Sequence, residues 1–338
     1  MHLVLPLPGN ERLARAVAGA AGFEIAEPEV RRFPDGESYV RLAGDVSGRD
    51  VVLVCTLADP DPAFLTLVFA ADAARDLGAR SVTLLAPYLA YMRQDKRFRP
   101  GEAVSSRSFA RLVSSSFDRL VTVDPHLHRF PALDALYTIP ATALHAAPLI
   151  ADWIGREVKD PLPIGPDEES EQWVGAIAQR IGAPHAVLKK IRHGDRSVEI
   201  ALPDLSQWKD RQPVLVDDIA SSGQTLIEAA TKLVEAGLER PVAAVIHPLF
   251  AGDAYARLKA VTRQIVSTDS VPHQSNAISL APLLAEALAS PGTDRPGLVR
   301  KRREPEPEDE VERAGWESFP ASDPPPWTPG SAVGGGKP

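Results

Sequence analysis

The sequence has little of what disulfide-rich, membrane or secreted proteins need. It contains a single cysteine, Cys55, so an intramolecular disulfide is excluded. Its 338 residues hold no run of about 20 apolar residues, the length that a helix needs to cross a bilayer. Residues 1–6 lack the basic flank and the long apolar core of a signal peptide. We therefore expect a soluble, cytoplasmic protein without a membrane partner.

An excess of positive charge is also missing. The formal net charge is −8 at pH 7, which argues against a general nucleic-acid-binding surface, so we expect no nucleic-acid partner. An anionic substrate must then be bound by local groups of basic residues. Two such groups occur, one within residues 93–107 and the other within residues 189–196. Either group, taken alone, is equally compatible with a solvated loop.

The length and the pattern of the chain favour two domains. A length of 338 residues suits two domains, and a hydrophobic content of 44% is enough for each to bury a core. Strands and helices alternate, the pattern of parallel sheets with crossover helices. Residues 50–87 and 213–248 repeat a series of an apolar strand, a helix, a glycine and a strand that ends at proline. This repeat indicates an internal duplication, with chance similarity of two common βα units as the alternative.

The composition changes from about residue 290. Residues 290–338 hold ten of the 32 prolines, together with a basic run, an acidic run and three consecutive glycines. Such a segment cannot bury enough apolar surface to offset the entropy of ordering it. We expect this tail to be disordered.

The most informative segment is 214–225, in which an apolar strand leads through two carboxylates into a small, hydroxyl-rich loop and then a helix. The N–H groups and hydroxyls of a loop at a helix N-terminus bind phosphate, and the helix dipole favours the negative charge. The carboxylates can bind ribose hydroxyls or a bridging Mg²⁺. The predicted sugar-phosphate residues are Asp217, Asp218, Ser221, Ser222, Gly223, Gln224 and Thr225. An ordinary βα turn capped by Asp217 or Ser221 explains one side chain but not the series.

Two further segments carry a family resemblance. Residues 87–102 form a long polar loop after a predicted strand, at the end of the strand where parallel sheets bind ligands. With the series Arg32-Phe33-Pro34-Asp35-Gly36-Glu37 and the segment 217–225, this loop resembles the ribose-phosphate diphosphokinases, the phosphoribosyl diphosphate (PRPP) synthetases. The resemblance runs from about residue 3 to residue 289 and is closer to archaeal-type members. Without the other segments, Asp35-Gly36 indicates only a hairpin turn.

The resemblance implies an α/β fold of two doubly wound type I phosphoribosyltransferase-like domains related by internal duplication. It implies ATP and ribose 5-phosphate as substrates, Mg²⁺ as the cofactor, and a homo-oligomer, either a dimer or a hexamer. The implied ATP-binding residues are Arg93, Gln94 and Asp95, together with Asp35, Gly36 and Glu37, which in the family reach the nucleotide of a neighbouring subunit.

The same resemblance implies the metal ligands and the catalytic residues. The implied metal-binding residues are Asp124, His126 and Asp167. Taken alone, His126 is read more readily as an ordinary loop histidine. Lys190 would stabilise the transferring phosphoryl group with Arg192 beside it, since cationic groups neutralise the charge that spreads over the phosphoryl oxygens. Lys189 competes with Lys190 by position alone, and the spacing to Arg192 favours Lys190.

One segment departs from the family pattern. Family members place small residues after the Pro-Asp pair, where backbone amides approach diphosphate, but this chain has four acidic residues between Asp167 and Glu171. Like charge next to diphosphate is unfavourable unless a metal lies between. Glu168, Glu169 and Glu171 thus indicate weak diphosphate binding, a second metal or an altered phosphoryl donor. Alternatively, they complement the dipole of a helix that continues to about Ile181.

We therefore predict a phosphoribosyltransferase-like domain with the ATP loop at residues 1–143, a second one with the ribose 5-phosphate loop at 144–289, and the tail at 290–338. The predicted reaction converts ATP and ribose 5-phosphate to PRPP and AMP. A phosphoribosyltransferase that consumes PRPP would share segment 217–225 but would not need residues 93–95 or the duplication. A catalytically impaired, nucleotide-binding regulatory homologue would explain the acidic residues 168–171 but not the retention of Lys190 and Arg192.

Overall fold

The computed structural model describes residues 1–290, with the exception of residues 43, 98, 128 and 194–196. These residues belong to one compact unit, Met1–Asp294. The predicted disordered tail lies outside the described residues from position 291 onward. Within the described part, no helix is both long and apolar enough to cross a membrane.

The first half of the chain forms a six-stranded parallel sheet with the strand order β2-β1-β5-β6-β7-β8. Its strands are β1 (His2–Pro6), β2 (Glu24–Ile25), β5 (Asp50–Val54), β6 (Ser81–Ala86), β7 (Arg119–Val123) and β8 (Ala141–Leu144). The helices of this half are α1 (Glu11–Ala21), α2 (Pro60–Asp76) and α3 (Ser105–Ser116). An antiparallel hairpin of β3 (Glu29–Arg32) and β4 (Ser38–Arg41) follows β2.

The second half repeats this topology, with the strand order β10-β9-β13-β14-β15-β16. Its strands are β9 (Pro161–Gly165), β10 (Ala186–Val187), β13 (Gln212–Ala220), β14 (Val242–Pro248), β15 (Gln264–Thr268) and β16 (Asn276–Ile278). Its helices are α4 (Ala147–Glu157), α5 (Glu171–Ile181), α6 (Gln224–Glu235), α7 (Ala254–Val261) and α8 (Ala281–Ala289). A second hairpin of β11 (Lys189–His193) and β12 (Ser197–Ala201) follows β10.

The two halves thus share one strand order and carry a hairpin at the same point of that order. In each sheet the first strand lies between the second and the third, so the order of the strands reverses next to it. In open parallel sheets, ligands bind at such a reversal, beyond the carboxyl ends of the strands. The structure confirms the predicted α/β fold with parallel sheets, and it gives each half one topologically equivalent place for a ligand.

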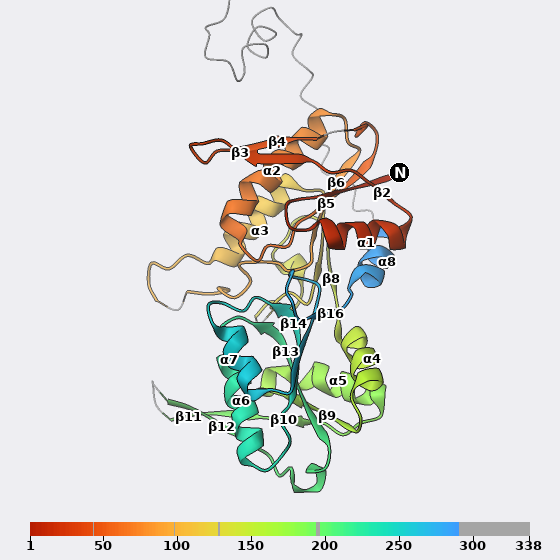
Figure 1. Ribbon diagram of the computed structural model, residues 1–338. Helices are drawn as coiled ribbons and strands as arrows, with labels where there is room; N and C mark the ends of the chain where they lie inside the picture. Colours follow the sequence, from red (N-terminus) through yellow and green to blue (C-terminus); the bar gives the residue numbers. More distant parts are fainter. Residues whose placement is uncertain (43, 98, 128, 194–196, 291–338) are drawn as a thin grey trace, which may run out of the picture. The chain divides into compact units, whose positions relative to one another are not determined.

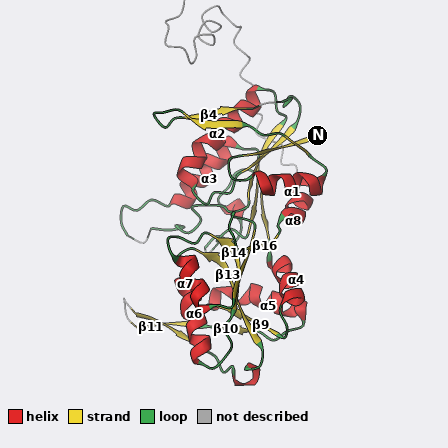
Figure 2. Cartoon of the chain, in the orientation of Figure 1, coloured by secondary structure: helices red, strands yellow, loops and turns green. Residues whose placement is uncertain are grey.

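Helices cover both faces of each sheet, as Figures 1 and 2 show. Because side chains alternate between the two faces of a strand, the apolar strands supply residues to two cores. In β5, Val52 and Val54 join the core on the side of α1, whereas Val51 and Leu53 join the core on the side of α2. The predicted apolar strands are therefore buried on both faces.

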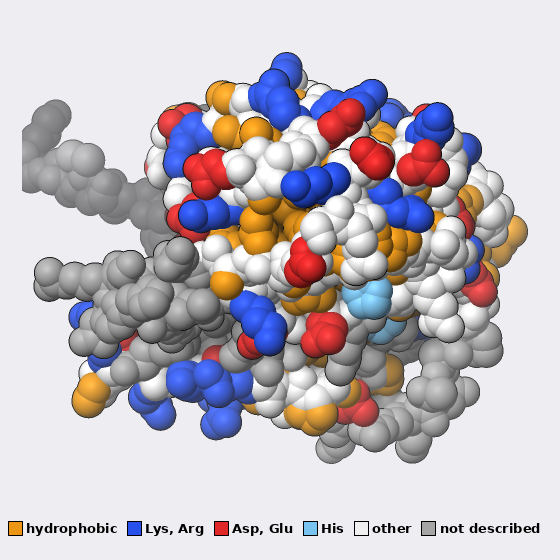
Figure 3. All heavy atoms as spheres, turned by 90° about the horizontal axis from the view of Figure 1, so that it is seen from below, with side chains coloured by type: hydrophobic (Ala, Val, Ile, Leu, Met, Phe, Trp, Pro, Cys, Tyr) orange, Lys and Arg blue, Asp and Glu red, His pale blue; other side chains and the backbone are white. Residues whose placement is uncertain are grey.

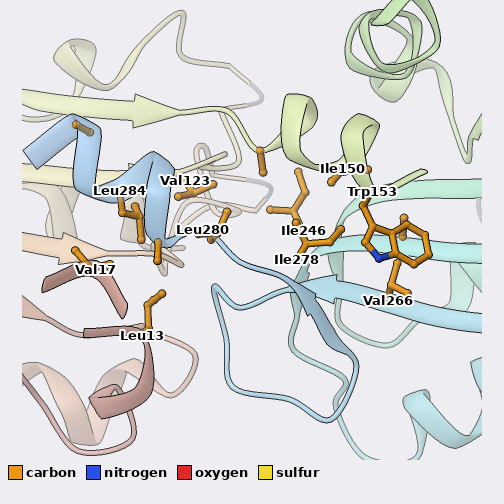
Figure 4. Packing of buried hydrophobic residues seen from close by; sticks show 14 of the residues in the cluster. Leu13, Val17, Val123, Ile150, Trp153, Ile246, Val266, Ile278, Leu280 and Leu284 are labelled. Carbon is orange, nitrogen blue, oxygen red and sulfur yellow. The ribbon is translucent and has the colours of Figure 1, made fainter. Parts of the chain in front are cut away.

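Two helices cross between the halves of the chain: each follows a strand of one sheet and packs against a helix that covers the other sheet. Helix α4 follows β8 of the first sheet and packs against α5, while α8 follows β16 of the second sheet and packs against α1. One hydrophobic core accordingly contains residues from both sheets, and Figure 4 shows Leu13 and Leu284 at one end of it and Trp153 and Val266 at the other. The boundary at residues 143 and 144 stays a prediction, since the described chain forms one unit.

Leu284→Ala should lower the free energy of unfolding by about 2–5 kcal/mol, because Leu284 is fully buried in this shared core and truncation leaves a cavity. Chemical denaturation followed by circular dichroism measures the loss. Leu65→Ala on α2 is the matched control, because Leu65 is 59% exposed and should change stability by at most about 0.5 kcal/mol. Equal stabilities of the two variants would show that α8 contributes nothing to the core.

Candidate active site

The predicted sugar-phosphate segment spans the end of β13 and the start of α6. Asp217 and Asp218 are half-buried in β13, and the loop that follows ends at Gly223, which has a φ of +66°. This left-handed conformation favours glycine, so the sequence places glycine where the chain turns into the helix. The hydroxyl of Ser222 accepts a hydrogen bond from the backbone N–H of Gln224 at 3.4 Å. A short polar loop at a helix N-terminus is therefore present, as the sequence predicts.

Gln224 and Thr225 begin α6, but the side chain of Gln224 has other partners. Its amide nitrogen donates to Glu228 Oε1 at 2.6 Å, and its amide oxygen accepts from Arg257 at 2.8 Å. The side chain of Gln224 thus ties α6 to α7. A phosphate contact from this residue would come from its backbone N–H.

Asp218 connects the two sheets. Its Oδ2 lies 3.0 Å from Nδ1 of His126, which follows β7 of the first sheet. Burial opposes ionisation of Asp218, but the hydrogen bond from His126 and the positive charges of His126 and His247 outweigh it, so the pKa of this carboxyl lies below its usual value. The carboxyl ends of β7 and β13 consequently meet, and they place His126 beside the predicted ribose carboxylates.

Asp124 has partners within the chain for both carboxylate oxygens. Oδ1 lies 2.9 Å from Nδ1 of His145, and Oδ2 accepts from the backbone N–H of Ala146 at 2.8 Å. The hydrogen bond that His145 donates to the Asp124 carboxylate raises the pKa of His145. Asp124 therefore anchors the turn from β8 into α4, and a metal at Asp124 would share these oxygens.

The sequence interpretation did not single out His247, although it marks the end of a predicted strand. His247 is the penultimate residue of β14, with 1% of its surface exposed, and burial lowers its pKa. Its Nδ1 lies 2.9 Å from the hydroxyl of Ser270, and its Nε2 lies 3.3 Å from the carbonyl oxygen of Asp124. The edge of Tyr88, after β6, packs against the imidazole. The sequence signal that could have identified His247 is a histidine at the end of an apolar predicted strand.

The predicted ATP loop follows β6. Arg93 is exposed and has no hydrogen-bond or ion-pair partner among the described residues, so its guanidinium group is available to an anion. Gln94 accepts a hydrogen bond from the hydroxyl of Ser105 at 3.1 Å. Asp95 is buried, and its Oδ1 lies 3.3 Å from Nε of Arg129. Within this loop, Arg93 has the exposure that substrate binding needs, whereas Asp95 contacts Arg129.

The hairpin with Asp35, Gly36 and Glu37 at its tip is a tight turn, as these residues predict. The backbone N–H of Glu37 donates to Asp35 Oδ1 at 3.2 Å, and Gly36 has a φ of +94°. Figure 1 draws this β3–β4 hairpin at the opposite end of the compact unit from the β11–β12 hairpin. Strand β4 of this hairpin packs against α2 of the same half of the chain.

Lys190 and Arg192 lie two residues apart in β11, and their side chains are outside the described part of the structure. The neighbouring Lys189 places its Nζ 3.9 Å from Oε1 of Glu168, with both side chains exposed. Glu168 belongs to a short 3₁₀ turn, Glu168–Ser170, which follows Asp167. The acidic segment thus contacts the strand that carries the predicted catalytic residues.

The start of α5 explains part of the acidic segment. Glu171 is in the first turn of α5, where a carboxylate complements the helix dipole, and α5 ends at Ile181 as predicted. Ser170 is buried, and a side chain added at Gly165 would meet its hydroxyl. Because Gly165 lacks a Cβ, the turn closes tightly onto the end of β9.

These residues fit a Mg²⁺ ion only if the substrate phosphates supply some of its ligands. No group of three or more His, Cys, Asp or Glu side chains that could hold a metal occurs among the described residues. Mg²⁺ usually keeps several waters and binds through one or two carboxylates plus substrate phosphates, so a preformed protein cage is not required.

Figure 3 shows acidic and basic side chains interspersed over one face, so anion binding must depend on local groups.

The fold and the site define the class: an α/β protein of the phosphoribosyltransferase type, with two copies of the sheet and a hydroxyl-rich loop at the N-terminus of α6. Residues 3–116 match the N-terminal domain of ribose phosphate pyrophosphokinase, and residues 132–283 match the phosphoribosyl transferase domain. The chain belongs to the ribose-phosphate pyrophosphokinase family, and the resemblance seen in the sequence is confirmed.

Curated relatives and a solved structure agree with this assignment. The chain is 37% identical over 290 residues to a ribose-phosphate pyrophosphokinase of Methanopyrus kandleri, which covers 85% of this chain and 98% of the relative. It is 35% identical over 284 residues to that of Methanosarcina acetivorans, over 83% of this chain and 97% of the relative. The crystal structure of phosphoribosylpyrophosphate synthetase from Mycobacterium smegmatis matches with a TM-score of 0.74 and 26% identity, over 85% of this chain and 97% of that one. The expected closeness to archaeal members is confirmed.

Proposed function

We propose that this enzyme transfers the diphosphoryl group of ATP to ribose 5-phosphate, giving PRPP and AMP. Its homologues support PRPP synthesis from ribose 5-phosphate. The observation that carries the proposal is the contact of 3.0 Å between Asp218 and His126. It joins the sugar-phosphate strand of one sheet to the strand ends of the other, so two substrates can lie side by side. A phosphoribosyltransferase that consumes PRPP does not need the second sheet.

The ribose 5-phosphate site would lie at β13 and α6. The loop 221–225 would bind the 5-phosphate through backbone N–H groups and hydroxyls, at the positive end of the α6 dipole. Asp217 and Asp218 would accept hydrogen bonds from the ribose hydroxyls. Since the pKa of Asp218 is lowered, this carboxyl stays ionised and able to accept them at neutral pH.

The ATP site would lie at the carboxyl ends of β6 and β7. Arg93 is exposed and would pair with a phosphate in bidentate fashion, while Gln94 would bind through its amide. The hairpin residues Asp35–Glu37 would complete the site from a neighbouring subunit, as the family resemblance implies. This requirement supports a homo-oligomer as part of the proposal.

The chemistry joins the 1-hydroxyl oxygen of ribose 5-phosphate to the β-phosphorus of ATP. The bond from that phosphorus to the oxygen bridging to the α-phosphate breaks, and AMP leaves. Lys190 and Arg192 would neutralise the charge that develops on the phosphoryl oxygens. His126 would hold a Mg²⁺ together with the substrate phosphates, and Asp124 and Asp167 are further candidate ligands; a bound ion would supply charge neutralisation on the phosphates. Positioning and electrostatics provide most of the catalysis in such transfers.

Incubation of the purified chain with ATP, Mg²⁺ and ribose 5-phosphate tests the proposal. AMP and PRPP should appear in equal amounts, measured by ion-exchange chromatography. ADP in place of AMP would show transfer of a single phosphoryl group. Nucleotide binding without any product would favour the regulatory homologue, and consumption of added PRPP with a free base would favour a phosphoribosyltransferase.

Replacing Glu168, Glu169 and Glu171 together with alanine tests the acidic segment. If these residues only support the start of α5 and the contact to Lys189, PRPP synthesis should stay level or rise. Stability should then fall by about 0.3–1 kcal/mol per charge, since exposed charges at a helix N-terminus contribute little more. Initial rates over a Mg²⁺ titration, with thermal melting alongside, provide the measurement. A collapse of activity that excess Mg²⁺ partly restores would instead assign them to a metal.

A further inference from the structure

A second pocket lies in the first half of the chain, away from the proposed sugar-phosphate loop. Its volume is about 460 Å³, within the usual range for small-molecule sites. It is lined by residues that follow β1 (Leu7 to Asn10), by Cys55, Thr56, Ala58 and Asp59 after β5, and by residues of the β3–β4 hairpin and α2. Val271 and Pro272, which follow β15, complete it.

This position is the topological equivalent of the proposed active site. The pocket lies beyond β1 and β5, the two neighbouring strands at which the strand order of the first sheet reverses. The corresponding strands of the second sheet are β9 and β13, and the segment 217–225 lies at the end of β13. Each place is accompanied by the equivalent hairpin, β3–β4 or β11–β12. The fold therefore offers the first half a ligand site by the same rule that places ligands in the second.

The pocket differs from a phosphate loop, because several of the backbone N–H groups around it already have partners. The N–H of Thr56 donates to Oδ1 of Asn10 at 2.7 Å, and the N–H of Leu57 donates to the carbonyl oxygen of Tyr88 at 3.1 Å. The N–H of Gly9 donates to Oε1 of Glu11. Proline at position 60 removes a further N–H at the start of α2. We therefore look to the side chains of the pocket for the main contacts to an anion.

The side chains that line the pocket select the kind of ligand. Arg32 donates to the carbonyl oxygens of Gly36 and Pro62, and it has no carboxylate partner among the described residues. Asp59 also lines the pocket and has no hydrogen-bond or ion-pair partner within the described part of the chain. Burial raises the pKa of Cys55 to about 12, so its thiol stays uncharged and adds to the apolar wall.

We propose that this pocket, which we name the Arg32 pocket, binds a small organic anion with a largely apolar body and one hydrogen-bond donor. The anionic group would pair with Arg32, whose charge no carboxylate of the described residues neutralises, and the donor would bind Asp59. The apolar body would lie against Leu7, Ala63 and Val271. No residue proposed for the transfer reaction lines this pocket.

Hydrogen bonds connect the wall of the Arg32 pocket to the proposed active site. The hydroxyl of Thr56 donates to the carbonyl oxygen of Ser270 at 2.7 Å, next to Val271 in the wall. The hydroxyl of Ser270 lies 2.9 Å from His247, which lies 3.3 Å from the carbonyl oxygen of Asp124. A ligand that displaces Val271 would therefore act on the strand ends where ATP is proposed to bind, and its effect on activity would be regulatory.

Binding of two matched probes to the full chain tests the proposal by calorimetry. Indole-3-acetate has an apolar ring, an N–H donor and a carboxylate. Indole-3-acetamide has the same ring and N–H donor but a neutral amide in place of the carboxylate. We expect indole-3-acetate to bind at least about tenfold more tightly than the amide. Arg32→Gln should abolish this difference. Equal affinity of the wild type for both probes, or no heat from either at millimolar concentration, would overturn the proposal.

Two further variants separate the Arg32 pocket from other surfaces. Ala63→Leu adds volume inside the pocket on α2 and should weaken indole-3-acetate binding at least about tenfold, even if Arg32→Gln disturbs the hairpin. Leu65→Ala, on the exposed side of the same helix, should leave binding unchanged. Unchanged binding to Ala63→Leu would place the probe elsewhere and refute the pocket. Since calorimetry reads binding directly, the result is independent of whether the chain makes PRPP.

Discussion

Lys190→Ala is expected to lower the turnover number of PRPP synthesis by about a thousandfold or more. A preorganised cation that meets developing charge contributes about 3–4 kcal/mol to the transition state, and in phosphoryl transfer the loss of such a group costs about 10³–10⁵ in rate. The fold should be intact, because Lys190 belongs to the two-stranded β11–β12 hairpin and not to the six-stranded sheets. Initial rates at saturating ATP and ribose 5-phosphate measure the effect, with circular dichroism to verify folding.

Lys189→Ala is the matched control for this variant. Lys189 contacts Glu168 at 3.9 Å with both side chains exposed, and exposed ion pairs contribute at most about 1 kcal/mol. The turnover number should change by less than about fivefold. A larger loss for Lys189→Ala than for Lys190→Ala would assign the catalytic role to Lys189, the competing candidate of the sequence.

Asp217→Asn is expected to raise the KM for ribose 5-phosphate by about 10- to 100-fold and to leave the KM for ATP nearly unchanged. Hydrogen bonds to a charged acceptor contribute about 1.5–3 kcal/mol, and Asp217 lies on the strand that leads into the phosphate loop. Asp218→Asn should instead affect both substrates, because Asp218 also contacts His126 at the end of β7. Steady-state kinetics with each substrate varied in turn separates the two patterns.

Glu235→Gln removes one negative charge from the far end of α6 and serves as the control for both variants. Glu235 pairs with Lys232 at 3.7 Å on an exposed surface, so neither KM should change. An equal effect of Asp217→Asn on the two KM values would contradict the division of the site into a ribose side and an ATP side.

Local patterns predicted the parts of the fold that depend on neighbouring residues. The apolar runs at residues 51–54 and 214–216 predicted buried strands, and both are buried because helices cover each sheet on both faces. The hydroxyl-rich loop before α6 was predicted from a strand, two carboxylates and a glycine, all within one βα turn. The predicted hairpin at Asp35-Gly36 followed from turn chemistry alone.

Contacts between distant residues could not be predicted in the same way. Nothing near residues 281–289 indicates that α8 leaves the second sheet to pack against α1, because that choice depends on a surface about 260 residues away in the chain. The same holds for His247 and Asp124, whose contact joins two sheets. The family resemblance grouped Asp95 with Arg93 in one ATP loop, and the structure buries Asp95 beside Arg129 and leaves Arg93 exposed.

The return of α8 to α1 determines the order in which a growing chain can complete its fold. Helix α1 is synthesised well before α8, so Leu13 and Val17 lack the α8 part of their core until residues 281–289 emerge from the ribosome. Contacts of such long sequence separation form slowly, since the loop that they close is most of the chain. Chains that stop before residue 281 would expose this apolar face of α1, and they would be substrates for chaperones and proteases.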